Sequence, residues 1–188
     1  MNYHKHTKVV FYRVIFILFS ILFFNLIVDP YDIYDSPKIK GFNLDKPMFF
    51  SHIRMSKALA VRKIRPEGVI LGSSKAEFGV DPDHYSWEGL DVYNLGLPGV
   101  NLYELLRYLQ HTVAIKKPKK VFLLLDFYMF NANKDNKPGF DEKRLSVDYS
   151  NSPQYSHYDF FSSVLSIDAT KASIKTIIGQ NKFYYIYL

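Results

Sequence analysis

The stretch of sequence that most restricts the fold is an apolar run close to the amino terminus. It reads VVFYRVIFILFSILFFNLIV, occupies residues 9–28, and contains Arg13 as its one charged residue. A helix of this length, at about 1.5 Å per residue, spans roughly 30 Å, which is the thickness of a bilayer core. Arg13 lies near the start of the run, where a long side chain can reach the lipid headgroups. We therefore predict a transmembrane helix here.

The charges on either side of this run predict its orientation. Basic residues precede it, and the first acidic residue of the chain, Asp29, follows it. Under the positive-inside rule, residues 1–8 form a cytoplasmic tail, residues 9–28 form the anchor in the inner membrane, and the rest is periplasmic. The charge-free part, residues 14–28, also fits a signal-peptide core, but no small residues follow it for cleavage. An uncleaved anchor is favoured over a cleaved signal, and both over a buried helix of a soluble protein.

The bulk composition narrows the class of protein further. The net charge is +6, and Lys5, Lys8 and Arg13 account for half of that excess. The short run KKPKK at 116–120 joins two apolar segments and is interpreted as a solvated turn, so we expect no nucleic-acid partner. The chain has no cysteine, which excludes disulfides and thiolate metal sites. No other cluster has metal-ligand spacing, and we expect no cofactor.

Two regions follow the predicted anchor. Residues 29–66 are predicted to be a juxtamembrane segment, rich in Pro, Gly and Asp, followed by a helix that Pro66 ends. Residues 67–188 are predicted to be an α/β domain. Its last part has helical spacing over 163–179, and the final NKFYYIYL shows no closing strand pattern. We therefore expect a domain that is incomplete at its carboxyl end, with an exposed sheet edge prone to pairing.

Three short apolar runs in the domain predict buried strands, at 68–71, 91–95 and 121–127. Between the second and third lies a predicted helix that Asn101 can cap. One face of this helix carries apolar side chains, namely Leu102, Leu105, Leu106, Leu109 and Val113. Strand, helix and strand at this spacing predict a right-handed βαβ unit, and hence an α/β fold with a parallel sheet and flanking helices.

Two loops are expected to meet beyond the carboxyl ends of these strands, where ligands bind in such sheets. The first strand runs into Gly72, Ser73 and Ser74, and the second ends in NLGLPGVN, with Gly96 and Gly99. The first loop offers hydroxyls, while the glycines of the second let backbone amides approach a ligand. This combination favours nucleophilic acyl transfer, in which a serine attacks and N–H groups stabilise the oxyanion. LGSSK lacks the remainder of a phosphate-loop motif.

The pair GSS and YNLGLPG, each after an apolar strand, resembles the first two sequence blocks of the SGNH/GDSL hydrolase superfamily, and most closely its membrane-anchored, envelope-facing relatives. The resemblance covers roughly residues 44–131. It implies a three-layer, flavodoxin-like domain. It also implies serine esterase or acyltransferase activity on an envelope polysaccharide or lipid, with an acyl donor protein as a further partner.

The resemblance also implies roles for particular residues. Ser74 matches the nucleophile, and its own N–H would be one oxyanion donor. Gly99 matches the glycine that supplies a second donor. Asn94 matches the asparagine that opens the second block and is expected to tie the loop, and Gly72 and Gly96 match glycines of the two loops.

Two further blocks of the superfamily are altered in this chain. The third block has Gly-x-Asn after the next strand, whereas here Asp126 and Tyr128 stand at those places and Asn131 is out of register. Asp126 is interpreted either as a residue that orients the site or as a cap on a nearby amide. The usual Asp-x-x-His near the carboxyl end is represented only by Asp81–His84, so His84 is a weak candidate for the base.

Other histidines, His111 and His157, have no better match to the base. Without a base a serine is a weak nucleophile. Two hypotheses therefore stand: an anchored acyl-ester hydrolase or acyltransferase acting through Ser74, or a non-catalytic or truncated envelope protein that keeps the fold as a scaffold or binding module.

Overall fold

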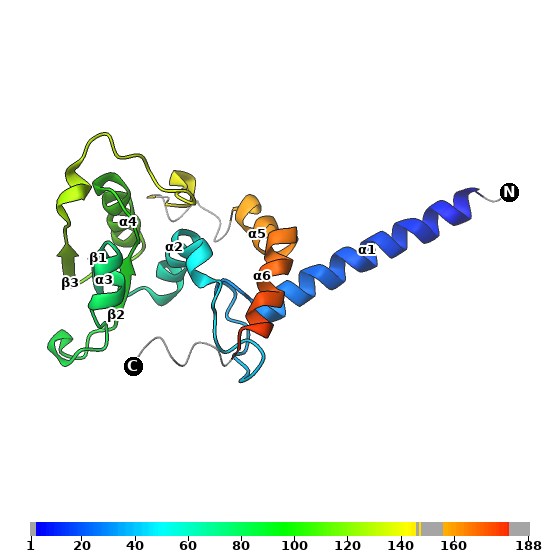
Figure 1. Ribbon diagram of the computed structural model, residues 1–188, viewed down its shortest axis with the longest axis horizontal. Helices are drawn as coiled ribbons and strands as arrows, with labels where there is room; N and C mark the ends of the chain where they lie inside the picture. The colour runs from blue at the N-terminus through cyan, green and yellow to red at the C-terminus, as the bar shows by residue number, and fades with distance from the viewer. Residues whose placement is uncertain (1–2, 146, 148–155, 181–188) are drawn as a thin grey trace. The chain divides into compact units, whose positions relative to one another are not determined.

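The structure is a computed structural model that describes residues 3–145, 147 and 156–180 (Figure 1). The chain forms two compact units. One contains the residues up to Ser51 together with those from Ser156 onward, and the other contains His52–Tyr155. The predicted carboxyl-terminal stretch without a strand pattern, at 181–188, lies outside the described residues.

The first unit is built on α1 (Tyr3–Val28), which confirms the predicted apolar helix. Its stretch His6–Val28 is long and apolar enough to cross a membrane, and most of its side chains are exposed. Two shorter helices, α5 (His157–Val164) and α6 (Ile167–Ile178), pack against α1 and against each other. The apolar helix is therefore partnered by the last helices of the described chain rather than by its sequence neighbours alone.

The segment after α1 is an ordered loop that ends in η1 (Phe49–His52). The carboxylate of Asp29 accepts hydrogen bonds from the amides of Ile33 at 2.8 Å and Tyr34 at 2.9 Å. Asn43, also buried, donates to the carbonyl of Ile27 at 3.0 Å, so the loop is fastened back to the end of α1. Burial raises the pKa of Asp29, against the opposing effect of those two amides.

The second unit contains a parallel sheet, which confirms the predicted α/β class. Its strands are β1 (Gly68–Gly72), β2 (Val92–Gly96) and β3 (Lys120–Leu124), in the order β2-β1-β3. Gly72 lies opposite Gly96 on one side and Leu124 on the other, so the carboxyl ends of the three strands form one edge. All five residues of β1 are buried, as expected for the central strand.

Helices pack on both faces of the sheet at β1 and β2, whereas the middle of β3 is exposed, so the prediction of a buried third strand is wrong. The helices are α2 (Ile53–Ile64), α3 (Ser74–Gly79) and α4 (Leu102–Ile115). The chain moves through α3 from β1 to β2, and back through α4 from β2 to β3. Because both connections join parallel strands in opposite directions, right-handedness places α3 on one face and α4 on the other. Helix α2 packs beside α4. Single turns follow at η2 (Tyr85–Trp87), η3 (Phe127–Phe130) and η4 (Glu142–Arg144).

Helix α4 begins as predicted but packs through a different face. The Asn101 side chain accepts from the Glu104 amide at 2.8 Å, which is the predicted cap. Of the predicted apolar face, Leu105 is buried while Leu102, Leu106 and Val113 are exposed. The buried face instead holds a polar group of contacts. Glu104 accepts from Arg54 at 2.8 Å, and the Tyr108 hydroxyl donates to the Arg54 carbonyl at 2.6 Å. Burying these paired groups determines the rotation of the helix.

Candidate functional site

The strand β1 passes directly into α3 at the two serines. Ser73 is the N-cap of α3; it is 1% exposed and accepts a hydrogen bond from the amide of Lys75 at 3.1 Å. Ser74 is the first residue of α3 and is partly exposed. Within the part of the chain that the structure describes, the Ser74 hydroxyl has no hydrogen-bond partner. Its amide is at a position where helical N–H groups have no partner within the helix.

The acidic side chain at this edge pairs with Ser73 rather than with Ser74. The Ser73 hydroxyl donates to Oδ2 of Asp126, and Nζ of Lys75 donates to Oδ1. These two bonds, that from Lys75 first, hold the pKa of Asp126 below its ordinary value, and the same contact raises the pKa of Lys75. At neutral pH the pair is therefore a carboxylate and an ammonium group. Asp126 fastens the end of β3 to the end of β1 and is a weak proton acceptor.

The second loop is a tight turn joined to the end of β1. The amide of Leu97 donates to the carbonyl of Gly72 at 2.8 Å, and the amide of Val100 donates to the carbonyl of Leu97 at 3.1 Å. Gly99 has a φ of +69° at the third position, after Pro98, which is the pattern of a type II turn. The turn thus keeps a residue without a side chain beside the end of β1.

Asn94 holds α3 against β2. Its side-chain amide donates to the carbonyls of Ala76 at 2.9 Å and Val80 at 3.0 Å, and its oxygen accepts from the amide of Gly96 at 2.8 Å. A Cβ on Gly96 would lie 2.4 Å from the backbone nitrogen of Glu77. This close approach requires glycine. Asn94 and Gly96 therefore position the helix that carries Ser74.

Gly72 has an equally close packing role. A Cβ there would lie 2.7 Å both from the side chain of Ala76 and from the carbonyl oxygen of Leu124. The residue is consequently enclosed by α3 on one side and by β3 on the other. Any side chain at this position would displace the turn that presents the two serines.

The loop after β3 brings lysines toward the Gly99 turn. Nζ of Lys134 donates to the carbonyl of Val100 at 3.3 Å and lies 3.6 Å from the centre of the Tyr128 ring. Burial lowers the pKa of Lys134, and the charge of Lys137 adds to that effect. A Cβ on Gly99 would lie 2.9 Å from Cε of Lys137. Together with Lys75, these side chains give the site a cationic rim that our sequence interpretation missed; Lys75, which directly follows Ser74, was the available signal.

Asn131, the out-of-register asparagine of the altered third block, is engaged elsewhere. Its side-chain oxygen accepts from the amide of Asn133 at 3.0 Å in a local turn. Tyr128 lies in η3 beneath Lys134. Tyr128, which stands at the asparagine position of that block, therefore has its ring against the Lys134 ammonium group.

The structure does not bring His84 together with Ser74. Nδ1 of His84 pairs with the Ser86 hydroxyl at 2.7 Å within its own loop. That loop is fastened to the first residue of β3, because Lys120 donates to Glu88 at 2.6 Å. It therefore lies at the amino ends of the strands, whereas the serines follow the carboxyl end of β1.

The two other histidine candidates belong to other elements of the structure. His111 is buried in α4, with Nε2 3.2 Å from the carbonyl of Ala58. His157 begins α5 in the other unit. Among the described residues there is also no group of three or more His, Cys, Asp or Glu side chains that could hold a metal ion.

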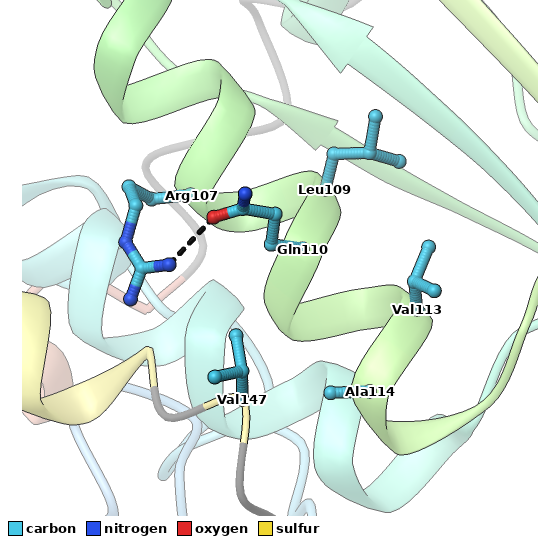
Figure 2. Close-up of a pocket in the computed structure, with 6 residues that line it drawn as sticks. All are labelled: Arg107, Leu109, Gln110, Val113, Ala114 and Val147. Carbon is cyan, nitrogen blue, oxygen red and sulfur yellow. Dashed lines mark hydrogen bonds between the residues drawn. The ribbon is translucent and has the colours of Figure 1, made fainter.

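A separate hollow lies along α4, with a volume of about 510 Å³. Figure 2 shows Leu109, Val113 and Ala114 lining it together with Val147, and Arg107 bonded to Gln110 at 2.6 Å. Because α4 runs antiparallel to the strands, its later turns lie toward their amino ends. The hollow is consequently not part of the serine site.

Comparisons of the chain with protein-family models, with curated proteins and with solved structures found no match. The class of protein is therefore set by what the molecule itself shows, namely a three-stranded parallel α/β unit and an apolar helix that can cross a membrane.

Proposed function

We propose that this chain is a membrane-anchored, SGNH-hydrolase-like protein of the inner membrane, with its α/β unit on the periplasmic side. Its activity is acyl-ester hydrolysis or O-acyl transfer on an envelope glycan or lipid, with Ser74 as the nucleophile. The observation that carries the proposal is the unengaged hydroxyl of Ser74 at the start of α3, directly after the strand end to which the Gly99 turn is bonded.

The chemistry follows from this placement. Oγ of Ser74 attacks the acyl carbonyl, and its proton passes to a base while the C–O bond to the leaving alcohol breaks. The developing oxyanion is stabilised by the N–H groups of Ser74 and Gly99. The acyl group then leaves Ser74 for water or for a sugar hydroxyl. Because His84 and His111 have partners elsewhere in the α/β unit, the proposal requires a base other than these two histidines.

The cationic rim supports an anionic substrate. Lys75 is largely exposed, with its ammonium group held by Asp126 at the serine edge, and Lys134 and Lys137 approach the Gly99 turn from the facing loop. The Asp126 carboxylate balances the charge of Lys75, so Lys134 and Lys137 supply the positive excess that favours binding of a negatively charged group. A phosphate-bearing glycan or lipid meets this requirement better than a neutral ester.

A second candidate function is that of a non-catalytic scaffold or glycan-binding module. It is favoured by one specific feature, because the acid at the site, Asp126, bonds to Ser73 and Lys75 rather than to a histidine. In that case the cationic rim would bind an anionic glycan without turnover.

Labelling with a fluorophosphonate separates the two candidates. The full chain in detergent micelles or nanodiscs is treated with the probe, and so are variants Ser74→Ala and Ser86→Ala, the latter an exposed serine of the distant loop. Parent and Ser86→Ala are expected to label, and Ser74→Ala is not. Equal labelling of Ser74→Ala and parent would exclude Ser74 as the nucleophile. If the folded parent fails to label but binds an anionic glycan, the scaffold function holds.

A further inference from the structure

Helix α6 has an unusual distribution of side chains. The residues it buries are small or polar: Ala169, Ala172, Ser173 and Thr176. Its isoleucine face consists of Ile167, Ile174 and Ile178, and these residues are 74%, 46% and 64% exposed respectively. A helix on a soluble protein normally buries its apolar stripe and exposes its polar residues. Helix α6 does the reverse.

The contact between α6 and α1 explains the small residues. Asn25 of α1 is fully buried there and uses its whole side chain. It donates to the carbonyl of Val164 at 2.8 Å and to the hydroxyl of Thr170 at 3.1 Å, and it accepts from the hydroxyl of Ser173 at 2.7 Å. Small residues that allow close approach, with hydrogen bonds between polar side chains across the helices, are the typical pattern of helix packing in membranes.

The position of Asn25 places this contact at the end of the membrane span. Asn25 lies three residues before Val28, the last residue of the segment able to cross a membrane, which corresponds to about 4.5 Å along the helix. Helix α6 therefore meets α1 at the level of its final turn. At the same level α1 exposes Phe23 and Ile27, so the exposed isoleucine face and exposed apolar side chains of the span occur at the same end of α1.

Two lysines accompany the isoleucine face. Lys171 and Lys175 are exposed and stand on either side of Ile174 in the sequence. Long lysine stems can lie along apolar surface while the ammonium groups reach lipid phosphates. Helix α5 adds exposed aromatic side chains at Tyr158 and Phe161, a residue type enriched at membrane interfaces.

We propose that α6 lies in the headgroup region of the bilayer, with its isoleucine face against the acyl chains and its lysines on anionic headgroups. The occupant of this face is lipid, since α6 is bonded to α1 at the end of the span and carries beside its isoleucines the charges that lipid phosphates attract. The contact holds the end of α1 in a fixed orientation. The inference rests on α1 crossing the membrane and is independent of any chemistry at Ser74.

The absence of cysteine allows a direct test with the full chain in nanodiscs of phosphatidylcholine and phosphatidylglycerol. A nitroxide label is attached to single cysteines introduced by Ile174→Cys and by Ile178→Cys. Asp168→Cys is the exposed control on the same helix, and Phe19→Cys marks the span. Collision rates with oxygen, which partitions into lipid, are compared with those of an aqueous nickel chelate.

The labels at Ile174→Cys and Ile178→Cys are expected to favour oxygen, as Phe19→Cys does, whereas Asp168→Cys favours the nickel chelate. If Phe19→Cys favours oxygen but both isoleucine positions behave like Asp168→Cys, the inference is wrong and the anchor stands. If Phe19→Cys favours the nickel chelate, α1 does not cross the membrane, and both the proposed anchor and the placement of α6 are wrong.

The lysines are tested by their lipid dependence. Phosphatidylglycerol is expected to move the label at Ile174→Cys deeper than phosphatidylcholine alone, and the paired changes Lys171→Gln and Lys175→Gln should abolish that shift. Equal depth in the two lipids would overturn the assignment of the lysines to anionic headgroups.

Discussion

The two outer strands of the sheet, β2 and β3, have different surroundings along their outer edges. At β2, Nζ of Lys57 donates to the carbonyls of Asn94 at 2.9 Å and Gly96 at 2.8 Å. Carbonyls two residues apart point to the same side of a strand, so the lysine occupies the outer edge of β2. At β3, Phe122 and Leu123 are about two-fifths to one-half exposed, and no described side chain bonds to the outer backbone edge.

This difference determines whether each outer strand can pair with a further β-strand. Lys57 is almost fully buried, its charge is matched by Glu77 of α3, and it occupies two of the outer carbonyls of β2. Burial lowers the pKa of Lys57, and Glu77 opposes that effect. An uncovered edge such as that of β3 is a template for another strand. The uncovered strand β3 leads directly to Asp126, the acid that pairs with Ser73.

The largest effect is expected from opening the closed edge. Lys57→Met leaves the Glu77 carboxylate and two carbonyls buried without a partner, which typically costs about 3–5 kcal/mol. The free energy of unfolding can be followed for the full chain in micelles through its single tryptophan, Trp87. The control Lys63→Met, at an exposed position of the same helix, should change stability by less than about 0.5 kcal/mol. Equal effects of the two changes would show that Lys57 does not seal the edge.

A matched pair of truncations compares the central strand with the open one. Leu71 and Leu123 lie opposite each other in register, one fully buried and one 47% exposed. Leu71→Ala should cost about 2–5 kcal/mol because it leaves a cavity in the core. Leu123→Ala should cost less than about 1 kcal/mol, since that side chain is already half in water. Urea unfolding of both variants gives the comparison, and similar losses would mean that β3 is covered in solution.

The smallest effect is expected in the stability at acid pH, where the contacts of Asp126 are lost. The pKa of Asp126 is lowered below its ordinary 3.8 by the bonds from Lys75 and Ser73. The stabilisation is therefore complete above that ordinary value and is lost as the pH falls through the lower pKa of the folded state. A Trp87 fluorescence titration of Asp126→Asn should lack this acid-sensitive component. An unchanged acid profile in the variant would mean that the two bonds do not persist in solution.

Sequence patterns predicted the elements whose information is local. The apolar length of α1, the buried run of β1 and the Asn101 cap each depend on a few neighbouring residues. The surfaces through which helices pack were not predictable in this way. Arg54 and Glu104 are fifty residues apart in the sequence. Asn25 and Lys57 also bond to residues far from them in the chain, Ser173 and Glu77 respectively. Only the folded chain shows that these polar groups satisfy one another.

The candidate site was predictable to the same extent. The Gly99 turn and the placement of Ser74 after β1 follow from glycine, proline and strand patterns. The bond from Ser73 to Asp126 required the register of β3 against β1, which no short pattern contains. The cationic rim depends on a loop that returns to the Gly99 turn. The positions of Lys134 and Lys137 in the sequence follow no pattern that relates them to Ser74.

The most direct test of the central claim is to identify the residue that carries a fluorophosphonate adduct. Trypsin releases both serines in one peptide, Ile64–Lys75, because the bond between Arg65 and Pro66 resists cleavage. Fragment masses then distinguish the two positions. We predict that the two-residue carboxyl-terminal fragment, Ser74 with Lys75, carries the added mass. An adduct confined to Ser73, or a folded protein without any adduct, would contradict the assignment of Ser74 as the nucleophile.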